Sequence, residues 1–182
     1  MPHIHTQPGQ IDVTVTMYLF RWRDDVLEMM LHMHKKLNKL LPIGGHIELD
    51  ETIWRAVAHE MEEESGYELS RVKLLQPKLR LASLDDAVIH PQPVVVNTHE
   101  ITKGHFHSDS AYAFLVDGQP TKTLAENESS DIRWMTMEDI DKLSDAEIYS
   151  NVSEICHFIV DNFSEWDIVE TNSYSLDKLR DK

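Results

Sequence analysis

Apolar and polar residues alternate along positions 11–20, where every second residue is apolar. A period of two is typical of a β-strand with one buried face. A second strand is predicted at 26–34, and residues 22–25 between the two favour a hairpin turn. Other apolar stretches predict four more strands, at 72–81, 94–101, 111–116 and 132–135.

The clearest helical pattern covers residues 52–65, which contain no Gly or Pro and are rich in Ala, Glu and Met. Asp50 or Thr52 can cap the first turn of this helix. Gly66 stands where a left-handed residue commonly ends a helix. The segment is therefore predicted to be helical from cap to cap.

Two further helices are predicted late in the chain, at 137–143 and 146–163. We expect residues 1–163 to form one domain and residues 164–182 to form a polar, loosely packed tail. Runs of strands with one central helix and helices at the end indicate an α/β or α+β sandwich.

The amino-acid composition limits which kinds of molecule the protein is expected to bind. The chain has 182 residues and 41% hydrophobic content, which suffices for one domain with a core. Its formal net charge is -15, from 32 acidic and 17 basic residues. This balance argues against binding to nucleic acid polymers or anionic membranes, because both need clustered Lys and Arg. A small phosphorylated substrate is compatible with it when a divalent cation bridges substrate and protein.

The single cysteine, Cys156, lies among apolar residues and is expected to be a buried side chain rather than a nucleophile. One cysteine forms no intramolecular disulfide, which fits a reducing compartment. The first residues lack a signal-peptide pattern, and no apolar run approaches the about 20 residues of a membrane helix. We therefore expect a soluble, cytoplasmic protein.

Three carboxylates, Glu60, Glu63 and Glu64, are spaced i, i+3 and i+4 in the predicted helix, so they share one helix face. Like charges at this spacing destabilise a helix by roughly 0.2–0.5 kcal/mol per pair. A Mg²⁺ ion bound among them would make the close spacing favourable, since this hard cation selects oxygen ligands. Taken alone, however, a glutamate-rich helix turn is more often a solvated surface.

The sequence before the helix changes this interpretation. A Gly44–Gly45 pair precedes the helix, and such a loop lets backbone atoms approach a metal or a phosphate. The segment 45–67 resembles the Nudix box, Gly-x5-Glu-x7-Arg-Glu-U-x-Glu-Glu-x-Gly-U, in which U is a bulky aliphatic residue. The matching fixed positions are Gly45, Glu51, Glu60, Glu63, Glu64 and Gly66. At residue frequencies of about 7%, six matches at a given start arise about once in 10⁷.

The segment departs from the box at two positions. His59 stands where the family has an Arg that orients the glutamates by ion pairing. A histidine performs this role when protonated, and more weakly as a neutral donor. Tyr67 replaces an aliphatic residue, which is a change in packing.

The resemblance implies an α/β fold, a Nudix-type α/β/α sandwich around a mixed β-sheet. It also implies Mg²⁺-dependent attack of water on a diphosphate bond in a nucleoside diphosphate linked to another moiety, with Mn²⁺ as an alternative ion. Family members are often dimers, so a homodimer is one expected state. The rival hypothesis is a catalytically weak or inactive module of the same fold that binds a nucleotide or sugar phosphate.

The resemblance also assigns roles to residues. Glu60 and Glu64 correspond to the main metal ligands, Glu63 assists them, and the backbone carbonyl of Gly45 completes the shell. Glu63 and Glu64 are thus expected to be catalytic, together with a general base from outside the box. Glu128 is the first candidate for that base, with Glu63 and Glu100 as others, and an exposed loop carboxylate is the alternative interpretation of Glu128.

The histidines offer a second candidate chemistry. His105 and His107 lie on one face of an extended segment that Asp109 continues, and His32 and His34 have the same spacing. Such pairs can bind a transition metal, but only with third and fourth ligands that a sequence does not reveal. Exposed or hydrogen-bonded histidines are the more common outcome. Because they precede an apolar strand, His105, His107 and Asp109 are also expected to line the substrate cleft.

Overall fold

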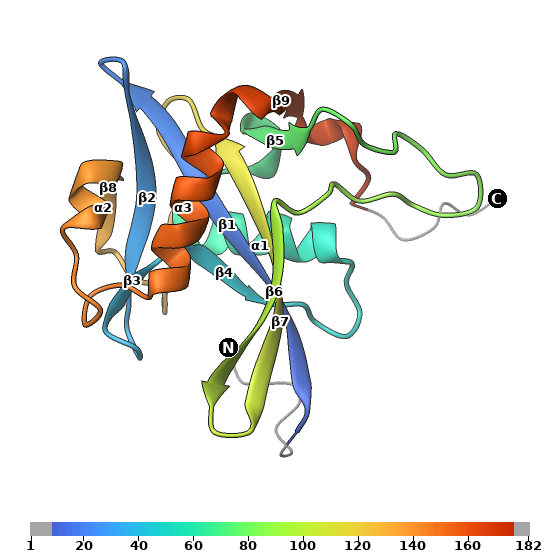
Figure 1. Ribbon diagram of the computed structural model, residues 1–182. Helices are drawn as coiled ribbons and strands as arrows, with labels where there is room; N and C mark the ends of the chain where they lie inside the picture. The colour runs from blue at the N-terminus through green and yellow to red at the C-terminus, as the bar shows by residue number, and fades with distance from the viewer. Residues whose placement is uncertain (1–8, 177–182) are drawn as a thin grey trace.

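The computed structural model describes residues 9–176, in which nine strands form one mixed sheet between helices (Figure 1). The strands are β1 (Ile11–Arg23), β2 (Val26–His34), β3 (Lys39–Leu41), β4 (Ile43–His46), β5 (Lys73–Pro77), β6 (Val95–Thr102), β7 (His105–Leu115), β8 (Ile132–Thr136) and β9 (Trp166–Glu170). The helices in these residues are α1 (Ile53–Ser65), α2 (Met137–Asp141) and α3 (Ser150–Asp161), with three short 3-10 turns. None of them is long and apolar enough to cross a membrane.

The centre of the sheet is the parallel pair β1 and β7, in which residues 11–20 lie beside residues 106–115. The other strand pairs of the described residues are antiparallel. The order across the sheet is β3-β2-β1-β7-β5-β9, while β4 pairs with β1, β6 with β7 and β8 with β2. Because β4 runs beside β1, the glycine loop that precedes α1 is held against the centre of the sheet.

Strand β1 is covered on both faces from its middle onward. Val15, Met17 and Leu19 pack in the cluster that contains α1, whereas Tyr18 and Phe20 pack in the cluster that contains α3. The strand therefore lies inside a sandwich, and its buried residues are not restricted to one face. The expected α/β/α arrangement around a mixed sheet is confirmed.

The predicted hairpin and the ends of the central helix are confirmed. Asp24 and Asp25 link β1 to β2 with φ angles of 49° and 61°, which suit the tight turn of a two-residue hairpin. Thr52 caps α1 by accepting a hydrogen bond from the backbone N–H of Arg55. Gly66 ends the helix with a φ of 72°.

Three predicted boundaries differ from the structure by four residues or more. Strand β5 ends at Pro77 rather than at residue 81, in keeping with the missing N–H of proline. Helix α3 begins at Ser150 rather than at residue 146, because Glu147 instead caps a turn by accepting hydrogen bonds from the N–H and hydroxyl of Ser144. Strand β7 begins at His105 rather than at residue 111, since its polar first half is paired on both sides.

Cys156 is fully buried on α3 against Met29 of β2, as expected. Burial raises the pKa of its thiol well above the ordinary range, so the neutral form is favoured. The side chain serves as a small hydrophobic residue in the core on the α3 side of the sheet.

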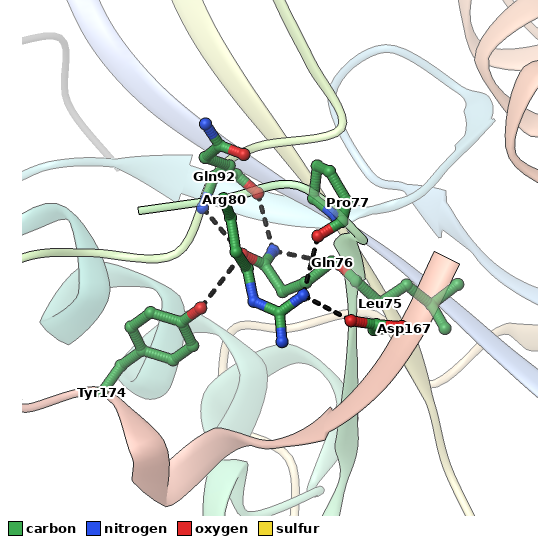
Figure 2. A network of polar contacts seen from close by, with 7 residues as sticks. All are labelled: Leu75, Gln76, Pro77, Arg80, Gln92, Asp167 and Tyr174. Carbon is green, nitrogen blue, oxygen red and sulfur yellow. Dashed lines mark hydrogen bonds and ion pairs between the residues drawn. The ribbon is translucent and has the colours of Figure 1, made fainter. Parts of the chain in front are cut away.

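The expectation of a loosely packed tail from Ser164 is wrong for much of the described segment. Residues 166–170 form β9, which pairs along the whole of β5. A chain of polar contacts reinforces this edge (Figure 2): Gln76 of β5 accepts hydrogen bonds from the N–H of Gln92 at 3.0 Å and the hydroxyl of Tyr174 at 3.2 Å. Its amide group donates to the carbonyl of Gln92 at 2.8 Å. The pairing of β9 depends on β5, which is distant in the sequence, so the polar composition of the segment after residue 163 did not reveal it.

Gln76 should matter more to stability than the more exposed ion pair beside it. Replacing fully buried Gln76 by Leu leaves the N–H and C=O of Gln92 and the hydroxyl of Tyr174 without this partner. We expect the free energy of unfolding in urea to fall by about 2–4 kcal/mol. The control Arg80→Gln removes the ion pair to Asp167, a partly exposed contact, and should cost about 0–1 kcal/mol. Equal losses in the two variants would contradict this assignment.

Candidate active site

Helix α1 presents its glutamates to two different environments. Glu60 and Glu64 are buried, with exposed fractions of 3% and 8%, whereas Glu62 and Glu63 are exposed. Glu63 nevertheless lines the same cavity as the buried pair. The three carboxylates that the helical spacing placed on one face therefore lie together, two of them in the interior and one at the rim.

Strand β4 reaches the buried pair because it has no side chains at Gly44 and Gly45. The backbone N–H of Gly44 donates a 2.7 Å hydrogen bond to Oε2 of Glu64. A Cβ atom on Gly45 would lie 2.0 Å from Oε1 of Glu60, and one on Gly44 would lie 2.2 Å from the carbonyl oxygen of Val15. Glycine at position 44 therefore allows the two strands to approach this closely, and glycine at position 45 leaves room for the carboxylate of Glu60.

His59 bridges two of the glutamates. Its Nδ1 lies 2.8 Å from Oε2 of Glu51, and its Nε2 lies 3.3 Å from Oε1 of Glu60. The hydrogen bond to Glu60 and the charges of both glutamates raise the pKa of His59 to about 9, against the effect of partial burial. The imidazole is therefore cationic at neutral pH and stands between Glu51 and Glu60, as an arginine at this box position would.

The pKa values of the buried carboxylates are raised. Burial is the main cause and raises the pKa of Glu64 to about 9, although the Gly44 N–H opposes it. The charges of Glu60 and Glu128, and a hydrogen bond with Glu128, raise it further. Burial also raises the pKa of Glu60. Such a cluster of carboxylate oxygens out of water fits a hard divalent cation, which would offset the repulsion and the lost hydration.

Glu128 reaches this cluster from the loop between β7 and β8. The loop is docked on the end of α1, where the N–H of Ala125 donates to the carbonyl of Glu63 at 2.9 Å. The N–H of Lys122 likewise donates to the carbonyl of Gly66 at 3.0 Å. Glu128 itself is half-buried and lines the cavity. The fold thus brings together Glu128 and the α1 glutamates, which are 64 positions or more apart in the sequence.

A cavity of about 790 Å³ adjoins the glutamates. Its lining includes His107 and Asp109 of β7 but not His105, so the expected group of three is divided. Asp109 is buried and accepts hydrogen bonds from the hydroxyls of Thr14 at 2.8 Å and Thr16 at 2.9 Å. Burial raises the pKa of Asp109, while these hydroxyls lower it.

Glu100, another candidate base, also lines this cavity. Its Oε1 accepts the N–H of Gly104 at 2.7 Å, so its carboxylate closes the turn between β6 and β7. This contact gives Glu100 a local structural role that Glu128 does not have.

Several lining residues carried no signal in the sequence. They come from the start of α3 and the residue before it, from the turn after β2, and from β6, and include Tyr149, Asn151, Leu37, Asn97 and His99. Only tertiary structure places these segments at one cavity. His46 also lines it, and its position immediately after Gly45 was a usable signal.

Known proteins share the sequence pattern and the fold that build this site. Residues 12–154 match the family model described as NUDIX domain. No curated protein matches the chain. A solved hydrolase of the NUDIX family from Clostridium perfringens is 23% identical, with a TM-score of 0.64, and the alignment covers 84% of this chain and 97% of that one.

Two other solved structures have similar folds at lower identity. The Ap4A hydrolase of C. elegans is 16% identical with a TM-score of 0.63, over 85% of this chain and 99% of that one. The NUDIX domain of Shewanella oneidensis NrtR, complexed with ADP ribose, is 16% identical with a TM-score of 0.60, over 85% of this chain and 89% of that one. At these identities the likeness concerns the fold.

The close approach of Gly45 to Glu60 can be tested directly. Gly45→Ala places a methyl group where Oε1 of Glu60 lies, so the carboxylate must move. We expect affinity for Mg²⁺ or Mn²⁺, measured by calorimetry, to fall by at least about tenfold, since displaced ligand partners cost about 10–100-fold. Gly104→Asn is a suitable control, because nothing lies within 4 Å of a Cβ there and asparagine tolerates its φ of +80°. Unchanged ion affinity in Gly45→Ala would show that Glu60 is not a ligand.

Proposed function

This chain belongs to the NUDIX family, and from that membership we propose that it hydrolyses a diphosphate bond in a nucleoside diphosphate linked to another moiety, with Mg²⁺ as cofactor and Mn²⁺ as a substitute. The residues proposed to hold the ion are Glu60 and Glu64, assisted by Glu63 and by the backbone carbonyl of Gly45. Such an ion supplies neutralisation of charge on the phosphate oxygens and a lowered pKa for bound water.

The observation that carries this proposal is the burial of Glu60 and Glu64 at the wall of a cavity of about 790 Å³. Pockets of about 300–1,000 Å³ suit small-molecule ligands, so this one has room for a nucleotide with a second group. Carboxylates on a solvated surface would need no cation. Here burial and mutual repulsion make a cation-free pair unfavourable, which supports an ion-binding role.

Glu128 is the proposed general base. Its loop is fixed to α1 through Ala125, and its carboxylate lies within hydrogen-bonding reach of Glu64. A carboxylate at this place can take a proton from the attacking water while the α1 glutamates keep their positions. Glu63, at the rim, is proposed to orient that water.

The wall formed by β7 is proposed to hold the rest of the substrate. Asp109 is fixed by the hydroxyls of Thr14 and Thr16, and His107 lies two residues earlier on the same face. His105 does not line the cavity, so its contribution to substrate binding is through support of His107.

The alternative function is binding of a nucleotide-like ligand without cleavage. The NrtR domain, whose structure contains ADP ribose, has this fold, and His59 departs from the box. Phosphate release from dinucleoside polyphosphates, ADP-ribose, nucleotide sugars and nucleoside triphosphates, with and without Mg²⁺, separates the two functions. Tight binding without turnover on every substrate would favour the alternative.

Glu64→Gln should abolish most metal-dependent turnover. We expect kcat to fall by about 100-fold or more, since an electrostatic contribution of this kind is worth about 10²–10³ in rate. The fold should persist, because glutamine keeps the size of the side chain and its amide oxygen can still accept the N–H of Gly44. Mg²⁺ should also raise the thermal midpoint of the parent chain but not that of the variant.

The matched control for this variant is Glu62→Gln on the same helix. Glu62 is exposed and pairs with Lys122 at 3.6 Å, outside the cavity lining. Turnover of Glu64→Gln equal to that of the control would place the ion elsewhere.

Glu128→Gln should lower kcat with little change in KM. Loss of a general base typically lowers the rate by about 10²–10⁴-fold. The rise of kcat with pH that reports deprotonation of the base should also disappear. Glu126→Gln, an exposed glutamate of the same loop, is the control. A larger effect on KM than on kcat would instead assign Glu128 to substrate binding.

A further inference from the structure

The start of β1 has the reverse of the usual polarity. Ile11 and Val13 are 47% and 48% exposed, whereas Asp12 and Thr14 are 1% and 5% exposed. An ordinary half-buried strand turns its apolar residues inward. Burial of a carboxylate is costly unless other charges or hydrogen bonds compensate it. The burial of Asp12 therefore indicates a specific polar environment.

The strand registers show what faces Asp12. In the parallel ladder Asp12 is directly opposite His107, and His105 lies two residues earlier on the same face of β7. In the antiparallel ladder His46 of β4 is opposite Thr14, two residues after Asp12. Partners in a ladder share a face of the sheet, so one carboxylate and three imidazoles lie on one face.

The distances among these groups have the dimensions of a metal site. One ligand atom from each of Asp12, His105 and His107 lies within 4.8 Å of the others. Oδ2 of Asp12 is 3.3 Å from Nε2 of His105 and 3.5 Å from Nε2 of His46. Donors at about 2.0–2.1 Å from a tetrahedral zinc ion are about 3.3–3.4 Å apart, close to the two distances from Oδ2 of Asp12.

The same groups are enclosed by the protein. Oδ2 of Asp12 and the Nε2 atoms of His46 and His107 are shielded from solvent. The rings of His46 and His107 stand edge to face, with centroids 4.9 Å apart. Their donor set of imidazole nitrogens with one carboxylate suits Zn²⁺ and related ions, whereas the oxygen donors of α1 suit Mg²⁺.

We propose that Asp12, His105 and His107, with His46 as fourth ligand, bind a divalent transition-metal ion of the Zn²⁺ class. The site joins β4, β1 and β7 beyond the part of the sheet that α3 covers (Figure 1). Since His46 and His107 both line the cavity, the ion fixes a part of the cavity wall. Its role is structural, and the proposal does not depend on the proposed hydrolysis.

The test measures zinc rather than turnover. Tag-free full-length protein is stripped with a chelator, and zinc binding is measured by calorimetry and elemental analysis in excess Mg²⁺, which competes at the oxygen-only site. We expect one zinc ion per chain and a rise in thermal midpoint of several degrees. Asp12→Asn and His107→Gln should each weaken zinc binding by more than about 100-fold, since even outer-shell losses cost about 10–100-fold.

Two controls locate the ion. Glu64→Gln should keep the zinc, because its carboxylate belongs to the other site. His157→Gln should also keep it, because His157 pairs with Asp141 at 2.7 Å without the further histidines that surround Asp12. In case a ligand variant fails to fold, zinc X-ray absorption of the parent chain shows imidazole scattering if the site is as proposed. No zinc bound to the parent chain, zinc lost only in Glu64→Gln, or an oxygen-only spectrum would each overturn the proposal.

Discussion

Burial of Glu60 and Glu64 on one face of α1 removes hydration from two carboxylates and brings them close together, and the surrounding structure must offset both costs. The offset comes from the N–H of Gly44 and from the cationic ring of His59, which Glu51 holds in place. Each partner belongs to a different segment. The position of the two carboxylates thus depends on three features: the register of β4 on β1, the capped start of α1 and the loop that contains Glu51.

Strand β4 contacts both the buried glutamates and the rest of the cavity wall. It pairs with only residues 14–17 of β1, yet Gly44 and Gly45 contact the glutamates of α1 and His46 joins the polar face of β1 and β7. Any shift of register in β4 would move a side chain into Glu60 and remove His46 from Asp12 together. The glycines and the histidine are therefore one structural unit, and the two polar clusters share its geometry.

Helical spacing predicted that Glu60, Glu63 and Glu64 share a face, because that information is local. It did not predict that Glu63 is exposed while Glu60 and Glu64 are buried, since burial depends on where β4 and the Glu128 loop dock. The same limit explains β9 and the first half of β7. Residues 105–110 have one apolar residue and residues 166–170 have three, too few to define a strand on their own, and the pairing of both segments arises from strands far away in the sequence. A prediction that relies on apolar patterns misses strands whose buried residues are polar.

The different donor atoms of the two clusters also determine which ion each would prefer. Zn²⁺ binds most mixed donor sets more tightly than Mg²⁺, so a site made of carboxylates alone is open to occupation by the wrong metal. Imidazole nitrogens shift this balance, because they favour Zn²⁺ much more than they favour Mg²⁺. An enclosed group of three histidines and Asp12 would therefore bind Zn²⁺ more tightly than the carboxylates of α1 do. The ion held by the oxygen donors of α1 would then depend on the free concentrations of the two ions, and a large excess of Mg²⁺ favours the hard cation there.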